Sequence, residues 1–149
     1  MTTLPTPFKT WFSDRGWNVH PHQQAMMDQA QDPALMLIAP TGGGKTLAGF
    51  LPSLIELADG RHTGLHTLYV SPLKALAADI KRNLRAPVDE MNLPIRIEDR
   101  TGDTSYTQKR RQRADPPHIL LTTPESLALL LSYEDAPRIF KGLQRIIVD

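Results

Sequence analysis

Residues 39–46, Ala-Pro-Thr-Gly-Gly-Gly-Lys-Thr, have the residue types that a nucleoside triphosphate site requires. Glycines let backbone N–H groups come close to phosphate oxygens. A lysine can neutralise the β and γ phosphates, and a threonine hydroxyl can hold Mg²⁺. The general pattern begins with glycine, where this chain has Ala39, but the glycines nearest the phosphates are present. The pattern predicts ATP and Mg²⁺ bound by Thr41, Gly42, Gly43, Gly44, Lys45 and Thr46, with Lys45 and Thr46 also catalytic.

A strand and a helix must position this loop. Residues 34–39 are an uninterrupted apolar run, which predicts a buried central strand. Residues 46–57 have apolar side chains at three-to-four spacing, which predicts a helix, and Pro52 is expected to kink it. A strand before the loop and a helix after it favour a phosphate site over a flexible glycine turn beside a solvated lysine, because the helix N-terminus also attracts anions.

The rest of the chain alternates short apolar runs with helical stretches, which predicts an α/β fold with a mainly parallel sheet covered by helices. Further helices are predicted at residues 8–14, 22–31, 73–91 (with a possible end near Pro87), 105–113 and 125–131, and further strands at residues 66–71, 95–98, 118–122 and 145–148. The sequence shows no internal repeat and no low-complexity tract.

Three polar loops follow predicted strands: Ser-Pro-Leu-Lys-Ala-Leu at 71–76, Thr-Gly-Asp at 101–103 and Thr-Thr-Pro-Glu-Ser at 122–126. Hydroxyls, a lysine and helix N-terminal amides are groups that contact a phosphodiester backbone. Each loop alone is equally typical of a plain connection or a helix cap. The candidate nucleic-acid contacts are Ser71, Pro72, Lys74, Thr101, Gly102, Asp103, Thr122, Thr123 and Pro124. The basic run Lys109, Arg110, Arg111 and Arg113 is either a further contact or a solvated helix face.

Composition narrows the classes of protein. The 149 residues carry a net charge of only +1, so nucleic-acid binding would depend on local charge. There is no cysteine, which excludes disulfides and thiolate chemistry. The five histidines lack metal-ligand spacing. No apolar run approaches membrane-spanning length, and the N-terminus is unlike a secretory signal, so a cytoplasmic protein with no membrane partner is expected.

Taken together, these segments resemble the motor core of superfamily 2 helicases of the DEAD/DEAH (DEXH) box type. Residues 39–46 resemble motif I, 71–76 motif Ia, 101–103 the Thr-Gly-Asp element and 122–126 motif Ib. Residues 145–149 resemble the motif II strand. Residues 8–17, 21–23, 47–57 and 64–76 further resemble bacterial ligase-associated DEXH-box helicases and their large helicase-related (Lhr) relatives. The resemblance implies a three-layer α/β/α RecA-like fold.

The resemblance also assigns roles. It implies that Gln23 recognises the adenine edge, that Phe8 or Trp11 contacts the adenine face, and that Asp149 holds Mg²⁺ through water and is catalytic. It implies an ATP-dependent helicase acting on DNA, single-stranded or tailed, in DNA repair. It divides the chain into an N-terminal helical segment, 1–32, and the first RecA-like domain, 33–149.

In this superfamily a glutamate follows the motif II aspartate, and a second RecA-like domain supplies an arginine finger. Because the chain stops at Asp149, we expect an N-terminal part of a longer motor, with the fold incomplete at its C-terminus and without hydrolysis of its own. Residues 145–148 as the edge strand of a small domain is the alternative.

Two other classes of protein also fit a phosphate loop between strand and helix. A small-molecule kinase has one, although the loops at 71–76 and 122–126 would have no purpose there. A non-catalytic module that binds nucleotide or nucleic acid is the second alternative. Titration with labelled ATP and single-stranded DNA separates the three.

Overall fold

The computed structural model describes residues 1–40, 42 and 44–149. In the described residues four short strands form one parallel sheet, in the spatial order β2-β3-β1-β4. The strands are β1 (Thr67–Val70), β2 (Ile97–Arg100), β3 (Ile119–Thr122) and β4 (Arg145–Val148). All three pairings are parallel and in register, so the carboxyl ends of the strands meet at one edge of the sheet.

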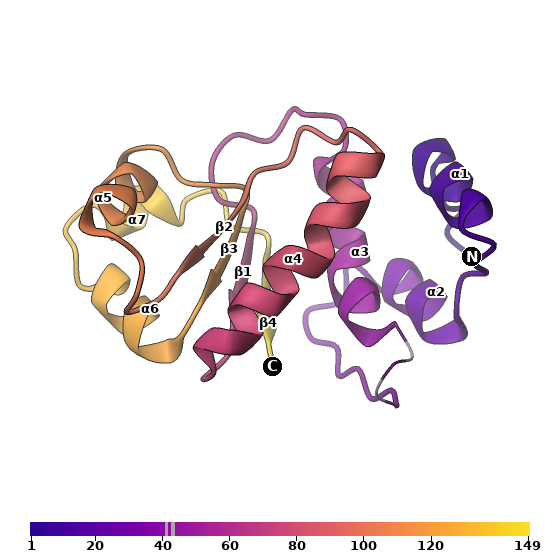
Figure 1. Ribbon diagram of the computed structural model, residues 1–149, viewed down its shortest axis with the longest axis horizontal. Coiled ribbons are helices and arrows are strands. Elements are labelled where there is room, and N and C mark those ends of the chain that lie inside the picture. Colours follow the sequence, from indigo (N-terminus) through magenta and orange to yellow (C-terminus); the bar gives the residue numbers. More distant parts are fainter. Residues whose placement is uncertain (41, 43) are drawn as a thin grey trace.

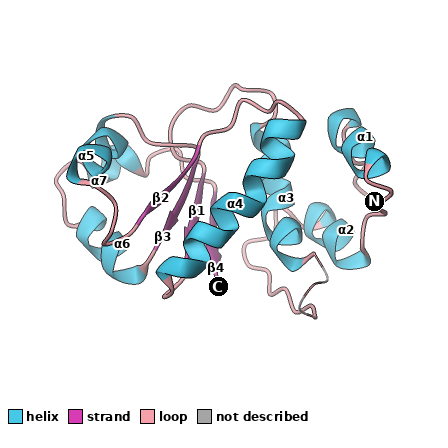
Figure 2. Cartoon of the chain, in the orientation of Figure 1, coloured by secondary structure: helices cyan, strands magenta, loops and turns pink. Residues whose placement is uncertain are grey.

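Helices alternate with these strands, as a parallel sheet requires. They are α1 (Thr6–Asp14), α2 (Pro21–Asp28), α3 (Lys45–Leu57), α4 (Lys74–Glu90), α5 (Tyr106–Ala114), α6 (Pro124–Leu131) and the four-residue α7 (Ala136–Ile139). Figure 1 shows α3 and α4 on one side of the sheet and α5, α6 and α7 on the other, with α1 and α2 beyond α3. The predicted three-layer α/β/α arrangement is confirmed, and Figure 2 shows how the strands lie between the helices.

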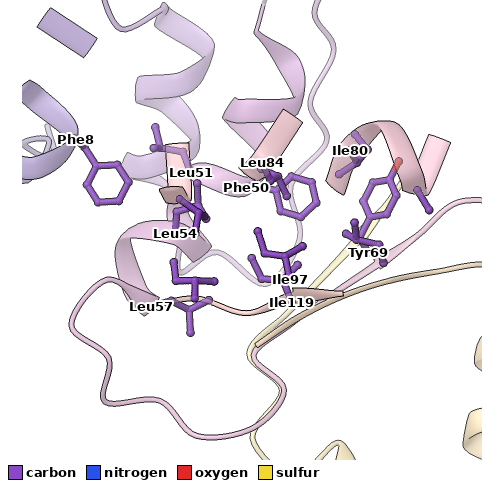
Figure 3. Close-up of a cluster of buried hydrophobic side chains, with 14 of the residues drawn as sticks. Phe8, Phe50, Leu51, Leu54, Leu57, Tyr69, Ile80, Leu84, Ile97 and Ile119 are labelled. Atoms are coloured by element: carbon purple, nitrogen blue, oxygen red, sulfur yellow. The ribbon is translucent and has the colours of Figure 1, made fainter. Parts of the chain in front are cut away.

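Two hydrophobic clusters hold the layers together. The larger one lies between the sheet and α3 and α4, and it includes Leu51, Leu54, Leu84, Ile119 and Leu121. Figure 3 shows several of these side chains converging from α3, α4 and the strands. The smaller cluster packs Leu68 and Leu120 on the opposite face against α6 and α7. Burial of branched apolar side chains on both faces is what fixes a parallel sheet between helices.

The first predicted strand is wrong. Residues 34–39 have no strand structure, and Leu35, Met36 and Ile38 are exposed, the last two at 86% and 85%. An apolar run becomes a central strand only where its backbone groups find partners and both of its faces are covered. Among the described residues, β4 is the outermost strand and pairs with β1 alone. The apolar run therefore lies off the sheet.

The other predicted elements are present, with boundaries moved by up to three residues. β2 lies two residues later than predicted, at Ile97–Arg100, and α2 ends at Asp28. Pro52 does not end α3, and α4 continues through Pro87 to Glu90. The short helix α7 was not predicted, because four residues are too few to show a helical period.

The described helices are all too short or too polar to cross a membrane. The division of the chain at residues 32 and 33 stays a prediction. Phe8 of α1 and Met27 of α2 belong to the same buried cluster as α3, so both N-terminal helices pack directly on the phosphate-loop helix.

Candidate nucleotide site and nucleic-acid interface

The N-terminus of α3 presents free backbone N–H groups. Gly44 is the N-cap residue, with φ of +75°, and in the part of the chain that the structure describes no side-chain cap occurs at this helix end. Gly42 has φ of +83°, in the left-handed region that favours glycine. Uncapped amides at the positive end of a helix dipole form a binding site for an anion. The predicted contacts Thr41 and Gly43 lie outside the described residues.

A cavity of about 340 Å³ lies at this helix end and brings three predicted residues together. Lys45 and Thr46 enter it from α3, and Asp149 enters from the end of β4. The Asp149 N–H donates to the Val70 carbonyl oxygen at 3.0 Å, so the backbone of Asp149 continues the parallel ladder beyond β4. Sequence positions more than a hundred residues apart thus share one site.

The donors in this cavity suit Mg²⁺ that a nucleotide brings with it. Two carboxylates, from Asp32 and Asp149, and two hydroxyls, from Thr46 and Tyr69, line it. No group of three or more histidine, aspartate or glutamate side chains that could hold a metal ion occurs in the described part of the chain. Mg²⁺ is usually held by one or two carboxylates together with phosphate oxygens and water, so this sparse set of oxygens fits the ion.

Gln23 contacts the phosphate loop directly. Its side chain is 2% exposed; Oε1 accepts from the His20 N–H at 2.9 Å, and Nε2 donates to the Gly44 carbonyl oxygen at 3.4 Å. The first contact is half of a capping box that starts α2. A Cβ at position 44 would lie 2.7 Å from Nε2, so the Gln23 side chain would have to shift, and the positive φ itself favours glycine there.

A second, larger cavity of about 870 Å³ adjoins the same loop. It is lined by aromatic and polar side chains, including Trp11, Trp17, Gln23 and Asn83, and it reaches Gly42, Gly44 and Thr46. Trp11 therefore lines an open space, whereas Phe8 is 1% exposed and packed in the main cluster. Of the two predicted aromatic contacts, Trp11 is the one placed beside the loop.

Arg15 organises the aromatic wall of this cavity. Its guanidinium carbon lies 4.7 Å from the centre of the Trp11 ring and 4.9 Å from that of Trp17. Both Trp11 and Arg15 donate to the Glu90 carboxylate at the end of α4. These hydrogen bonds, with the guanidinium charge, lower the pKa of Glu90, the largest effect coming from Arg15. Arg15 and Glu90 thus fix α1 to α4, a role that sequence reasoning missed because the partners are far apart in the chain.

The three predicted nucleic-acid loops leave the sheet at the same edge, because they follow β1, β2 and β3 in parallel. Most of their hydroxyls are engaged within the fold. Thr122 is fully buried and donates to the Arg100 carbonyl oxygen at 2.7 Å, and Thr123 accepts from Ser126 N–H as the N-cap of α6. Ser71 and Thr101 are also buried.

The exposed members of the nucleic-acid set are Pro72, Lys74, Gly102, Asp103 and Pro124. Lys74 Nζ lies 3.2 Å from the Asp103 carboxylate, which joins the loop after β1 to the loop after β2 across the end of β3. Direct contact with a phosphate backbone is thus left to Lys74 and to backbone amides, and stays a prediction for all nine residues.

The basic run on α5 is partly committed to other contacts. Arg111 pairs with Glu98 at 2.6 Å, and Arg113 pairs with Asp135 at 3.0 Å while lying over the Tyr133 ring. In the described residues, Lys109 and Arg110 have no ion pair within 4.0 Å. Arg111 and Arg113 are thus engaged by side chains of the fold, and both interpretations of the basic run, a nucleic-acid contact and a solvated helix face, stay predictions.

Tyr69 is a site residue that sequence reasoning missed. It lies on β1, is 1% exposed, and donates its hydroxyl to Asp149 Oδ2 at 2.8 Å. Burial, followed by the hydrogen bond and the charge of Asp149, raises the pKa of Tyr69 above its usual range. The sequence signal that could have identified Tyr69 is its hydroxyl, because it occurs beside Leu68 and Val70 in a buried strand and a buried tyrosine hydroxyl usually has a hydrogen-bond partner.

Comparison with known proteins agrees with this geometry. The family model for DEAD/DEAH box helicases matches residues 20–149. The chain is 38% identical to the ATP-dependent helicase Lhr-Core of Methanocaldococcus jannaschii, over 98% of this chain and 19% of that protein. It is 45% identical to the Lhr helicase/probable uracil glycosylase of Mycolicibacterium smegmatis, over 76% of this chain and 8% of that protein. The chain thus spans at most about a fifth of the length of these relatives.

Solved helicase structures are similar to this chain over nearly all of its length. The Mycobacterium smegmatis helicase Lhr bound to ssDNA and AMP-PNP superposes with a TM-score of 0.84 and 39% identity, covering 97% of this chain and 20% of that one. The helicase MrfA bound to DNA and AMPPNP gives a TM-score of 0.85 and 30% identity, over the whole of this chain and 21% of that one. With the fold, the uncapped α3 N-terminus and the shared Lys45, Thr46 and Asp149 cavity, these matches place the chain in the DEAD/DEAH box helicase family.

Proposed function

We propose that this chain is the ATP-binding N-terminal part of an ATP-dependent helicase that acts on nucleic acid, and on DNA in particular. The observation that carries the proposal is the cavity at the uncapped N-terminus of α3, which Lys45, Thr46 and Asp149 line together. An anion-binding helix end, a cation and a carboxylate are the set that a triphosphate with Mg²⁺ requires.

Each residue has a defined part in this proposal. The α3 amides donate to phosphate oxygens, and the Lys45 ammonium neutralises the terminal phosphates. Thr46 and Asp149 supply the oxygen ligands, Asp149 through water. Bound Mg²⁺ neutralises charge on the phosphates and holds them in place. The chain's own groups thereby bind and orient the triphosphate.

The aromatic cavity is the proposed site of the base. It opens beside Gly42 and Gly44 and has Trp11 and Trp17 in its wall. Indole rings provide a flat apolar surface that suits a purine. Gln23 can contribute to adenine recognition with the second N–H of its amide and the second lone pair of Oε1, because each of its amide atoms makes one contact within the fold.

The carboxyl edge of β1, β2 and β3 is the proposed nucleic-acid interface. Lys74 is the exposed cation there, and the α6 N-terminus follows Thr123 on the same edge. Two similar structures are named as bound to ssDNA or DNA, which supports DNA as the substrate class. We further propose that the helicase acts in the cytoplasm and takes part in DNA repair.

Removing the Lys45 charge tests the nucleotide site. Lys45→Ala should weaken binding of a fluorescent ATP analogue by about 10- to 100-fold, because a hydrogen bond to a charged group contributes about 1.5–3 kcal/mol. The matched control is Lys141→Ala, which removes an exposed lysine from the connection between α7 and β4. This variant should leave nucleotide affinity unchanged. Unchanged affinity in a folded Lys45→Ala variant would refute the nucleotide site.

Binding of DNA is tested separately by titration with labelled single-stranded DNA. Lys74→Ala should reduce affinity several-fold at low salt and flatten its salt dependence, because one phosphate contact releases about one counterion. If the variant binds DNA like the unaltered chain, with the same salt slope, the proposed interface is wrong while the nucleotide site stands.

A further inference from the structure

Tyr69 belongs to the main hydrophobic cluster, and its ring carries a polar hydroxyl. The ring packs with Phe50 at 5.6 Å between centroids, and the side chain is 1% exposed. A buried hydroxyl without a hydrogen bond destabilises the fold, and phenylalanine would fill the same space without that cost. The hydroxyl therefore calls for an explanation beyond packing.

Its hydrogen bond supplies one. Tyr69 Oη donates to Asp149 Oδ2 at 2.8 Å, across 80 residues of sequence. The direction of donation is fixed by chemistry. A phenol hydroxyl has one proton to donate. An ionised carboxylate has only acceptors, so the proton lies between the two groups.

The backbone brings the two side chains to the same face. β1 pairs with β4 so that Tyr69 is opposite Ile147, and Asp149 follows Ile147 by two positions. Side chains two residues apart on a strand point to the same face. Tyr69 and Ile147 both contact the cluster beneath α3. Asp149 is thus directed toward the helix that carries Lys45 and Thr46. One cavity is lined by all of these residues: Lys45, Thr46, Tyr69, Ile147 and Asp149.

We propose that Tyr69 is a positioning residue, whose hydroxyl holds one oxygen of Asp149 so that the other oxygen faces the Mg²⁺–phosphate site. The inference rests on the proposed nucleotide site and adds a residue to it. Aspartate has two soft torsions, and Asp149 is exposed, so without this bond its carboxylate would sample several orientations. One fixed oxygen leaves a single orientation for the ion's water shell.

The test compares nucleotide affinity with and without the metal. A fluorescent ATP analogue is titrated into the 149-residue chain in Mg²⁺ and again in EDTA. Tyr69→Phe should weaken binding by about 3- to 10-fold in Mg²⁺, the usual scale for loss of a group that orients a metal ligand being about tenfold or more. Affinity in EDTA should be unchanged. Tyr133→Phe, which removes a tyrosine hydroxyl near α6, should match the unaltered chain in both.

A double-mutant cycle shows whether Tyr69 acts through Asp149. Tyr69→Phe should have no further effect on Mg²⁺-dependent affinity in an Asp149→Ala background. A full effect in that background would overturn the inference, as would equal Mg²⁺ enhancement in Tyr69→Phe and the unaltered chain. Tyr69→Met, a second variant without a hydroxyl, should reproduce the Tyr69→Phe result if Tyr69→Phe proves unfolded by circular dichroism. Absence of any nucleotide binding by the unaltered chain would instead overturn the proposed function.

Discussion

The two sides of the sheet's carboxyl edge differ in how firmly they are built. On the side of β1, β2 and β3, every loop is tied by its own hydroxyls, such as Thr122 on the Arg100 carbonyl oxygen, and by the Lys74–Asp103 pair. On the side of β4, Leu35, Met36 and Ile38 of the apolar run lie exposed, and the N-terminal amides of α3 face a cavity. The polar groups of the first side are hydrogen-bonded or paired within the fold. On the second side, the N-terminal amides of α3 are available to bind a ligand.

The difference shows what a strand and a binding loop each require. β1 and β3 have a partner on both sides and are buried, whereas β4 has one partner in the described residues, and Ile146 and Val148 are exposed. A run as apolar as residues 34–39 gains its energy only when both of its faces are covered. Unsatisfied amides, in contrast, are what an anion site needs.

The first prediction separates buried from exposed apolar residues. Leu121→Ala, in β3 at 0% exposure, should cost about 2–5 kcal/mol of unfolding free energy, because it removes buried methyl groups and leaves a cavity. Ile38→Ala, at 85% exposure, should change it by less than about 0.5 kcal/mol. Urea denaturation measures both.

Equal losses from these two variants would break the comparison. They would mean that residues 34–39 pack against the sheet in solution as firmly as β3 does.

The second prediction concerns the cluster that holds α3 on the β4 side. Burial raises the pKa of Glu56, but hydrogen bonds from His66 and Arg145, with their charges, outweigh it and hold the pKa at about 2, from 4.5. Because the pKa is lower in the folded chain, the Glu56 carboxylate contributes stability above pH 4.5, and this is lost as pH falls toward 2. The shift corresponds to about 3 kcal/mol, and solvent screening of this partly exposed carboxylate reduces the contribution to about 2 kcal/mol.

Urea unfolding of the unaltered chain and of Glu56→Gln from pH 6 to pH 2.5 tests this. The stability difference between them should be constant above pH 5 and shrink as pH falls below 4.5. A difference that does not change across this range would show that the Glu56 carboxylate contributes no ion-pair energy.

The third prediction has the smallest effect on stability and acts on the other side of the edge. Asp103→Asn should change the free energy of unfolding by less than about 0.5 kcal/mol, because the Lys74–Asp103 pair is exposed. The same change should raise affinity for single-stranded DNA by about 2- to 5-fold at low salt, since it frees Lys74 and removes a negative charge from the edge.

Asp59→Asn, a similar change beyond the end of α3, is the control and should leave DNA affinity as it was. Equal gains in DNA affinity from Asp103→Asn and Asp59→Asn would show that the effect comes from net charge alone. The loops after β1 and β2 would then have no particular role in binding DNA.

Local pattern predicted most of this fold. The helix after the glycine-rich segment and the strands β1, β3 and β4 could be placed to within about a residue, because short apolar runs beside turn residues determine them locally. The prediction of a strand at residues 34–39 was wrong because a strand also needs neighbouring strands to pair with, and the local sequence pattern does not show these. β2 was placed two residues early, since Pro94 and the Gly102 turn limit the strand without fixing its register.

Only part of the proposed site could be named from the sequence. The sequence placed Lys45 and Thr46 directly, and resemblance supplied Gln23 and Asp149. The contact of Gln23 with Gly44 and the bond from Tyr69 to Asp149 could not be read from the sequence, because both join residues more than twenty positions apart. Burial of Ser71, Thr122 and Thr123 was equally invisible, since a hydroxyl that caps a helix and one that meets a phosphate have the same residue type.

The long helix α4 sets the distance between the two proposed binding regions. It begins at Lys74, beside the nucleic-acid edge, and its last residue, Glu90, holds Arg15 and Trp11 at the wall of the aromatic cavity. Seventeen residues make a stiff rod of about 25 Å. The two proposed binding regions therefore share one rigid element, which fixes their separation along the molecule.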